Sequence, residues 1–229
     1  MVARDFVRSI FRLSLLVLCS FLFVFLIQKY VYQVHLIKGS SMEKTLSNGD
    51  RLLISVFNKN KVKRGDVVVF KKDNTFFVKR CVGIPGDSVK IVDGRFEASN
   101  SIGDLYQIDL NSKISLSEIN CLTNFNPFFG QVYKQDWDSY NFGPLYLPRF
   151  EDSVSSEMYN TYSHLEEFIV RKDNLGNSHV GFNESFYFFV GDNVCNSDDS
   201  RSVGLIAGSE IIGIGYLVYS KANRSLKLI

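Results

Sequence analysis

The stretch TFFVKRCVGIPGD, residues 75–87, is the part of the sequence that most directly predicts the fold. It begins with β-branched and aromatic side chains, which favour a strand, and IPGD (84–87) has the composition of a tight turn. Because successive side chains of a strand point to opposite faces, Phe77, Lys79 and Cys81 share one face. The stretch therefore predicts a strand that carries a lysine between two poorly hydrated neighbours.

Further segments of the same kind lie on both sides of this strand. Each is short, aromatic or β-branched, and bounded by Gly, Asp, Asn or Pro. They are RLLISVF (51–57), DVVVF (66–70), SVKIV (88–92), FYFFV (186–190) and IIGIGYLVY (211–219). The sequence therefore predicts a mainly β protein from about residue 35 onward.

One long stretch, residues 95–182, departs from this pattern. It is polar and rich in Tyr and Asn, and a short helix is expected at 156–169. We interpret it as an inserted subdomain that separates two parts of the β core, residues 35–94 and 183–229.

The most apolar segment, LSLLVLCSFLFVFLI (13–27), contains no charged residue. A bilayer has a hydrocarbon core of about 30 Å, so flanking apolar residues are needed to complete a span. We expect residues 10–32 to form a transmembrane anchor. Arginines precede the segment, so the positive-inside rule places residues 1–9 in the cytoplasm and the rest of the chain outside.

Two other interpretations of the apolar segment stay open. A cleaved signal peptide has the same order of charges, but it would be followed by a small-x-small cleavage site. The residues that follow, QKYVYQVHLIKG (28–39), are bulky and polar and do not fit such a site. A buried core helix is the third interpretation.

Composition excludes several other classes of protein. A net charge of +2 without a long basic run gives no reason to expect nucleic-acid binding. The four cysteines are dispersed and there are three histidines, so we expect no metal site and no cofactor. A disulfide between Cys81 and Cys121 is considered as an alternative to free thiols.

Lys79 is a candidate base. Its apolar neighbours on the strand would desolvate the amine and lower its pKa, and a neutral lysine can accept a proton from a serine. The simpler interpretation is a lysine at a sheet edge whose amine reaches water. Ser41, in KGSSMEKTL (38–46), is the candidate partner, because Gly39 permits backbone geometry that aims the Ser41 amide at a substrate carbonyl. It can also be an ordinary loop serine.

A third segment, GDNVCNSDDSR (191–201), packs Asp, Asn and Ser into a loop after a hydrophobic strand. Taken alone it is consistent with a turn rich in Asp and Asn or with a calcium loop. The ligand offsets and the sixth-position glycine of an EF-hand loop are missing, which argues against calcium.

Four segments in this order resemble the type I signal peptidases, the bacterial leader peptidase family, whose members use a Ser-Lys dyad. They are GSSMEKTLSNGD (39–50), RGDVVVF (64–70), KRCVGIPGD (79–87) and GDNVCNSDDSR (191–201). The resemblance implies a β-rich catalytic domain behind an N-terminal anchor in the cytoplasmic membrane, on its outer face. It also implies cleavage of signal peptides from exported preproteins after small residues, with those peptides and the lipid bilayer as partners.

The resemblance also implies roles for individual residues. Ser41 would be the nucleophile and Lys79 the general base. Ser197 would hydrogen-bond and orient the lysine. Asp199 and Arg201 would form an ion pair that supports the site, and Arg80 matches the supporting arginine after the base. The turn that brings this loop to the site would be formed by Gly191, Asp192 and Asn193. The apolar residues expected to form the substrate pockets are Ile37, Met42 and Val78.

Four positions depart from the family pattern, and none removes a catalytic group. Lys44 replaces a proline, and Gly39 stands where some members have a serine that adds an oxyanion donor. The oxyanion hole is therefore expected to rest on the Ser41 amide. Val194 and Cys195 replace polar residues of the family pattern.

Two other functions stay open. Self-cleaving repressor-type peptidases also use Ser-Lys on a related β fold, but they are soluble and carry a DNA-binding domain instead of an apolar span. A membrane-tethered β protein that binds without catalysis is the other candidate. The presence of Ser41, Lys79 and Ser197 together argues against it.

Overall fold

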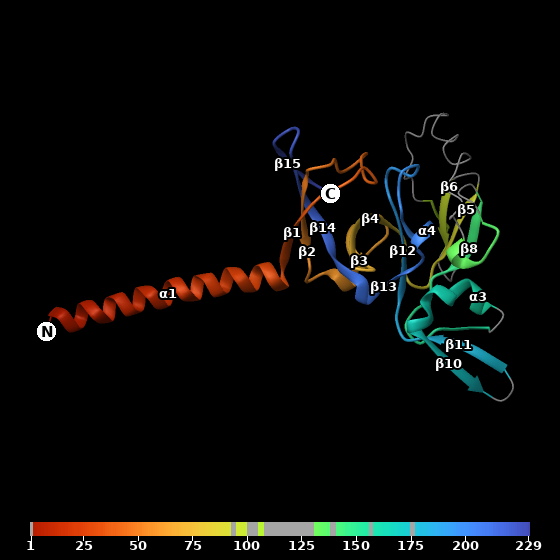
Figure 1. The fold of residues 1–229 in the computed structure, drawn as a ribbon, viewed down its shortest axis with the longest axis horizontal. Coiled ribbons are helices and arrows are strands. Elements are labelled where there is room, and N and C mark those ends of the chain that lie inside the picture. The colour runs from red at the N-terminus through yellow and green to blue at the C-terminus, as the bar shows by residue number, and fades with distance from the viewer. Residues whose placement is uncertain are drawn as a thin grey trace.

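The computed structural model describes residues 2–92, 95–99, 105–107, 131–137, 141–155, 158–174 and 177–229. Figure 1 shows a long N-terminal helix that projects from a body made mostly of strands. The mainly β fold class with an N-terminal apolar helix is therefore confirmed.

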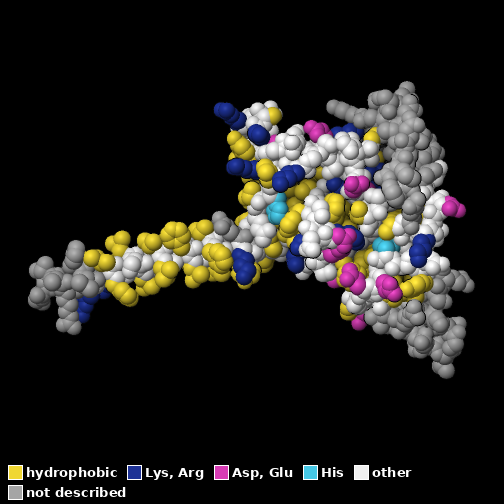
Figure 2. Space-filling view, viewed as in Figure 1, with side chains coloured by type: hydrophobic (Ala, Val, Ile, Leu, Met, Phe, Trp, Pro, Cys, Tyr) yellow, Lys and Arg dark blue, Asp and Glu magenta, His cyan; other side chains and the backbone are white. Residues whose placement is uncertain are grey.

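The helix α1 spans Val2–Tyr30. Its segment Ile10–Ile27 has a mean hydropathy of 2.7 with none of its residues buried, so by length and composition it is able to cross a membrane. Figure 2 shows apolar side chains along the visible face of this helix. The anchor was expected to extend to residue 32, but the helix ends at Tyr30. Tyr32 already belongs to a strand, where it pairs with Ser55.

The main sheet has eight strands in the order β1-β2-β14-β3-β4-β12-β13, with β15 paired to β14. All of its pairings are antiparallel. Its strands are β1 (Tyr32–Leu36), β2 (Arg51–Ser55), β3 (Val67–Lys72), β4 (Thr75–Gly83), β12 (Phe186–Val190), β13 (Ile206–Ala207), β14 (Ile211–Ser220) and β15 (Ser225–Leu228). The strands predicted at 51–57, 66–70, 75–84, 186–190 and 211–219 are confirmed, with ends that differ by a few residues.

The strand β3 shows why its sequence, VVVF, does not alternate between apolar and polar residues. Val67 and Val69 belong to one buried cluster, together with Ile37 and Met42. Val68 and Phe70 belong to another cluster on the opposite face, together with Cys81. A strand covered on both faces needs an unbroken apolar run.

Two smaller sheets form a second unit, on the side of the main sheet away from α1 (Figure 1). One has the order β7-β6-β5-β8 and the other β10-β11-β9. Their strands are β5 (Ser88–Val92), β6 (Arg95–Ser99), β7 (Leu105–Gln107), β8 (Phe142–Tyr146), β9 (Ser153–Ser155), β10 (Ile169–Asn174) and β11 (Asn177–Phe182). A boundary at residues 94–95 would separate β5 from β6, which are paired strands, so the turn at Pro85–Asp87 is the more natural start of this unit.

Short helices connect the sheets. They are η1 (Lys59–Lys61), η2 (Gln131–Tyr133), α3 (Tyr159–Tyr162), η4 (Ser163–Phe168), α4 (Ser200–Val203) and η5 (Gly208–Glu210). The helix expected at 156–169 therefore corresponds to α3 and η4, and residues 156–157 lie outside the described residues.

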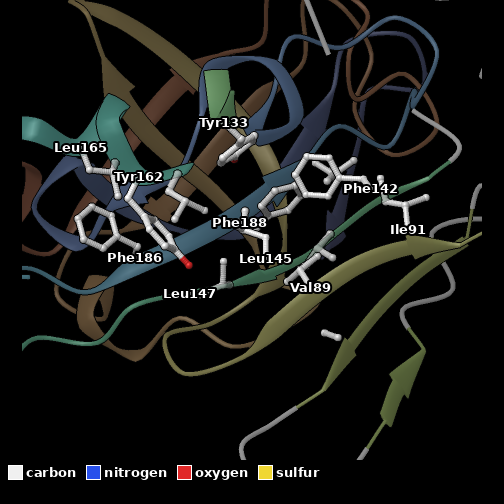
Figure 3. Packing of buried hydrophobic residues seen from close by; sticks show 14 of the residues in the cluster. Val89, Ile91, Tyr133, Phe142, Leu145, Leu147, Tyr162, Leu165, Phe186 and Phe188 are labelled. Atoms are coloured by element: carbon white, nitrogen blue, oxygen red, sulfur yellow. The ribbon is translucent and has the colours of Figure 1, made fainter. Parts of the chain in front are cut away.

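The core of the second unit is aromatic (Figure 3) and reaches the main sheet through β12. Phe186 and Phe188 of β12 pack into this core, whereas Phe189 packs into the core of the main sheet. Each fully buried phenylalanine contributes about 2–3 kcal/mol by removing its surface from water. One strand thus joins the two units, and the loop that follows it is held from both sides.

The cysteines do not form the disulfide considered between Cys81 and Cys121. Cys81 is a buried free thiol, which excludes that pairing, and Cys121 lies outside the described residues. Cys195 is disulfide-bonded.

Candidate active site

A cavity of about 580 Å³ lies where three segments of the main unit meet. The end of β1 and the turn that follows it contribute residues 35–42. The strand β4 contributes residues 76–79, and the loop after β12 contributes residues 196–198. The cavity therefore brings together the three sequence segments that were singled out for their chemistry.

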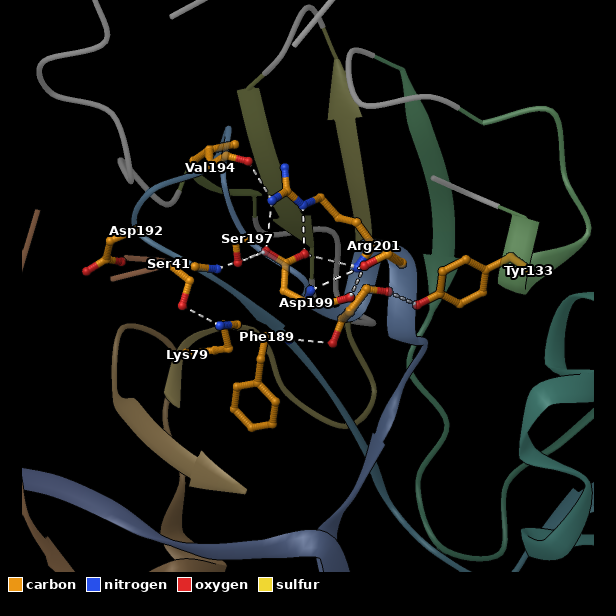
Figure 4. Close-up of polar contacts among 12 residues, drawn as sticks. Ser41, Lys79, Tyr133, Phe189, Asp192, Val194, Ser197, Asp199 and Arg201 are labelled. Atoms are coloured by element: carbon orange, nitrogen blue, oxygen red, sulfur yellow. Dashed lines mark hydrogen bonds and ion pairs between the residues drawn. The ribbon is translucent and has the colours of Figure 1, made fainter. Parts of the chain in front are cut away.

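Ser41 and Lys79 face each other in this cavity (Figure 4). The distance between Lys79 Nζ and Ser41 Oγ is 2.6 Å, although the two residues are 38 positions apart in the chain. Lys79 is only 4% exposed, so it is not a lysine whose amine reaches bulk water. Its amine also lies 5.7 Å from the centre of the Phe77 ring, the neighbour expected from the strand pattern.

The surroundings of Lys79 favour its neutral form. Burial lowers the pKa of Lys79 below its ordinary value of 10.5, and the charge of Arg201 lowers it further. The carboxylates of Asp199, Asp198 and Asp192 act in the opposite direction, but the net shift is downward. A neutral amine in contact with a hydroxyl is able to take its proton.

The turn that carries Ser41 depends on Gly39, whose φ is +86°. A side chain would strain this left-handed conformation, which glycine adopts freely. Met42 is buried beneath the turn, and the amide of Leu46 donates to the Met42 carbonyl at 2.7 Å. The turn is therefore anchored from below while the Ser41 hydroxyl points into the cavity.

The loop after β12 clamps this turn. The Asn193 amide donates to the Ser41 carbonyl at 2.9 Å, and Asn193 Nδ2 donates to the Ser40 carbonyl at 3.0 Å. The Asp192 amide points at Met42 Sδ, at 3.4 Å. The position of the candidate nucleophile is thus set by residues about 150 positions later in the chain.

Gly191 explains how the loop comes so close. A Cβ built on Gly191 would lie 2.6 Å from the Ser41 carbonyl oxygen and 2.2 Å from Ser197 Oγ. Any side chain here would force the loop away from the turn.

Ser197 lies in the cavity, but its hydrogen bond differs from the expected one. Its hydroxyl donates to Asp199 Oδ2 at 2.7 Å, and no hydrogen bond joins these two described residues, Ser197 and Lys79. The carboxylate of Asp199 is already positioned for this contact by the amide of Gly191, which donates to it at 3.0 Å.

Asp199 and Arg201 form the expected ion pair, with both side chains fully buried. Arg201 Nε donates to Asp199 Oδ1 and Nη2 donates to Oδ2, each at 2.8 Å. Burial alone would raise the pKa of Asp199, but the charge and hydrogen bonds of Arg201 hold it below its ordinary value. The pair therefore stays ionised inside the protein.

Arg80 has a partner that the sequence did not indicate. Its guanidinium binds both carboxylate oxygens of Asp192, at 2.7 Å and 2.6 Å, and donates to the Gly65 carbonyl at 2.7 Å. Thr45 donates to the same carboxylate. This cluster connects β4, the loop after β12 and the Ser41 turn. The sequence signal for this cluster is the acidic side chain of Asp192 in the GDN turn.

The residues expected to form substrate pockets, Ile37, Met42 and Val78, all line the cavity. Two aromatic residues that were not predicted line it as well. The rings of His35 and Phe76 lie 5.6 Å apart, and burial lowers the pKa of His35, so this histidine is neutral near pH 7. In the described part of the chain there is no group of three or more His, Cys, Asp or Glu side chains that could hold a metal ion.

Comparison with known proteins gives a consistent picture. The sequence model of the family described as "Signal peptidase, peptidase S26" matches residues 10–220. The protein named Signal peptidase I P from Bacillus subtilis subsp. natto is 27% identical over 214 residues, which cover 91% of this chain and 88% of that protein. A signal peptidase I from Aquifex aeolicus is 26% identical over 223 residues, covering 93% and 83% of the two chains.

A solved structure of a signal peptidase I from Enterococcus faecalis V583 is also similar, at 20% identity. The match covers 67% of this chain and 96% of that chain, with a TM-score of 0.35.

Proposed function

Because this chain belongs to the signal peptidase family, peptidase S26, we propose that Ser41 is its nucleophile and Lys79 its general base. Membership makes the chain a serine peptidase that removes signal peptides from preproteins. The observation that carries the proposed mechanism is the 2.6 Å distance between Lys79 Nζ and Ser41 Oγ, at a lysine that is 4% exposed.

In this mechanism Lys79 takes the proton of the Ser41 hydroxyl while the oxygen attacks the carbonyl carbon of the scissile bond. The proton passes from Lys79 to the leaving amine as the C–N bond breaks, which leaves an acyl-enzyme on Ser41. Lys79 then takes a proton from water, whose oxygen attacks the ester carbonyl. As the C–O bond to Ser41 breaks, Lys79 returns the proton to the Ser41 oxygen and the acid is released. The Ser41 amide is proposed as the donor to the oxyanion.

The substrate is proposed to bind as an extended strand between β1 and β4. In the described part of the chain, β1 pairs only with β2, and β12 pairs with β4 only from Arg80 onward. One edge of Phe76–Lys79 therefore carries no protein strand, and an extended peptide can add there by backbone hydrogen bonds.

The side chains along the cleft favour small residues near the cut. Ile37 and Met42 are buried, and with Val78 they form apolar walls. Such walls accommodate alanine at one and three residues before the scissile bond and leave little room for larger side chains.

The apolar helix α1 is compatible with a membrane anchor, in a family whose members are membrane-bound. We propose a single-pass topology with residues 1–9 in the cytoplasm and the catalytic unit on the outer face. The arginines before the apolar segment support this orientation.

Cleavage of a preprotein by the full chain in detergent tests the proposed nucleophile. Ser41→Ala should lower kcat by at least about a thousandfold, because it removes the hydroxyl that contacts the Lys79 amine at 2.6 Å. Ser153→Ala, the same chemical change at an exposed position on β9, is the matched control and should leave the rate unchanged. Equal rates for Ser41→Ala and wild type would contradict the proposal and favour a tethered binding protein.

A further inference from the structure

The second unit holds the loop of the candidate active site through two buried side chains. Tyr133 of η2 and His164 of η4 both come from this unit, and both reach α4, the short helix that follows Asp199. We propose that Tyr133 and His164 form a brace that positions the Ser197–Asp199 segment beside Lys79. The inference rests on the proposed Ser-Lys mechanism.

Tyr133 holds the start of α4. Its hydroxyl donates to the Ser200 carbonyl at 2.5 Å, and the side chain is fully buried (Figure 4). Ser200 directly follows Asp199, and its own hydroxyl accepts from the Phe189 amide at 2.9 Å. The residue next to Asp199 is thus tied to the second unit on one side and to the main sheet on the other.

His164 holds the end of α4. Its Nε2 accepts from the Leu205 amide at 3.2 Å, and its ring meets the Tyr133 ring edge-on, with centroids 4.9 Å apart. Burial lowers the pKa of His164 to about 3, so the ring is neutral, and the contact with the Leu205 N–H requires the tautomer in which Nε2 is the acceptor. A Cβ on Gly204 would lie 2.6 Å from the His164 ring, so the close approach also requires glycine there.

A helix as short as α4 needs such contacts. It has four residues, and an isolated helix of that length is unstable in water. Its N-cap, Asp199, accepts from the Arg201 amide within the same turn, which shapes the turn without placing it relative to Lys79. Placement has to come from groups outside the turn. The amides of Gly191 and Phe189 supply it from the side of the main sheet, and Tyr133 and His164 supply it from the second unit.

The brace acts on catalysis through Asp199. This carboxylate accepts a hydrogen bond from the Ser197 hydroxyl. Its charge also acts on the pKa of Lys79, as do the charges of Asp198, Asp192 and Arg201. A loosened segment would admit water to Lys79. Desolvation is the largest cause of the lowered pKa of Lys79 and outweighs the opposing charge of Asp199. Weakening it therefore raises the pKa of the amine, so a smaller fraction of it is neutral at a given pH. Tyr133 and His164 are therefore positioning residues that touch no substrate.

The chain offers a matched pair of variants for the test. Tyr162 is another fully buried tyrosine of the second unit, and its hydroxyl donates to the Tyr146 carbonyl at 2.8 Å, away from the loop. Tyr133→Phe and Tyr162→Phe each remove one hydroxyl that donates to a backbone carbonyl and keep the ring. Preprotein cleavage by the full chain in detergent is measured from pH 6 to 10, alongside thermal unfolding.

The brace predicts that Tyr133→Phe lowers kcat by about tenfold, with KM unchanged, because the misplaced segment disturbs the attacking geometry. The ascending limb of its pH profile should move to higher pH, whereas Tyr162→Phe should keep the wild-type limb and kcat at a comparable unfolding temperature. Equal kcat and equal limbs for the two variants would overturn the proposal.

His164 provides a second, independent arm in case Tyr133→Phe does not fold. His164→Gln keeps an oxygen that accepts from the Leu205 amide, and His164→Leu removes the acceptor. We expect His164→Leu to shift the limb upward and His164→Gln to restore it at least in part. An identical pH profile for both variants would contradict the brace.

The variant Ser41→Ala separates the two proposals. If it is active, the proposed Ser-Lys dyad is wrong. If it is inactive, the dyad stands and the Tyr133 and His164 variants decide on the brace.

Discussion

Two buried basic side chains lie on either side of the Ser197–Asp199 segment, and their surroundings are opposite (Figure 4). Arg201 is fully buried and pairs with the carboxylate of Asp199 at 2.8 Å. Lys79 is almost as deeply buried, but it contacts the neutral hydroxyl of Ser41, and among the described residues no carboxylate forms an ion pair with it. Burial is thus common to both groups, but only Arg201 has a carboxylate at contact distance to stabilise its charge.

The physical reason lies in the cost of desolvating a charge. A buried cation either finds an anion at contact distance or gives up its proton. An arginine cannot give up its proton, so Arg201 requires Asp199, whereas a lysine can, and the pKa of Lys79 is lowered accordingly. A base at position 79 therefore requires a lysine, which can lose its proton, whereas a structural cation at position 201 is best supplied by an arginine.

The largest expected effect comes from removing this difference. Lys79→Arg places a permanent cation where a neutral amine is needed, so kcat for preprotein cleavage should fall by at least about a thousandfold. Lys63→Arg, the same change at an exposed position, is the control. Activity within tenfold of wild type would show that Lys79 does not act as the base.

A smaller effect is expected on stability, and it compares two ion pairs. Asp199→Asn leaves Arg201 buried without a counter-charge, which should lower the free energy of unfolding by about 3–5 kcal/mol. Asp192→Asn acts on Arg80, which is 22% exposed, so the loss should be only about 1 kcal/mol. Denaturant unfolding of the full chain in detergent measures both. Equal losses would mean that burial does not distinguish the two pairs.

The smallest effect concerns the pH profile. Only neutral Lys79 accepts a proton, so kcat/KM should rise with pH through the pKa of Lys79, with an ascending limb below 10.5. Asp198 raises that pKa by its charge, so Asp198→Asn should move the limb to still lower pH. Asp136→Asn, an exposed acid of the second unit, should leave the limb in place. An upward shift in Asp198→Asn would contradict this electrostatic account.

Much of the main sheet could be predicted from local patterns. The segments that became β2, β3, β4, β12 and β14 are short apolar or aromatic runs between turn residues, and such runs favour strands in many contexts. The grouping of Phe77 with Lys79 on one face follows from strand geometry alone. The second unit was harder to predict, because its short strands lie in polar sequence and their pairing depends on distant partners. Ser88 of β5, for example, pairs with Tyr146 of β8.

The candidate site divides in the same way. Ser41, Lys79, Asp199 and Arg201 were named from the sequence, while the Arg80–Asp192 pair and the contacts of Tyr133 and His164 were not. The missed contacts join residues 112, 67 and 41 positions apart, and no local pattern records such a distance. Ser197 was assigned to the lysine, and only the folded loop shows that its hydroxyl donates to Asp199.

By itself the sequence determined an apolar helix followed by β strands, a lysine with apolar neighbours and a serine in a glycine-containing turn. These properties follow from side-chain chemistry and from the repeat of a helix or strand, which act over a few residues. The tertiary structure alone decided that the lysine amine and the serine hydroxyl meet at 2.6 Å and that the nearby arginine has a carboxylate partner. Desolvation and pairing are properties of a packed interior, and they exist only once distant segments have excluded water together.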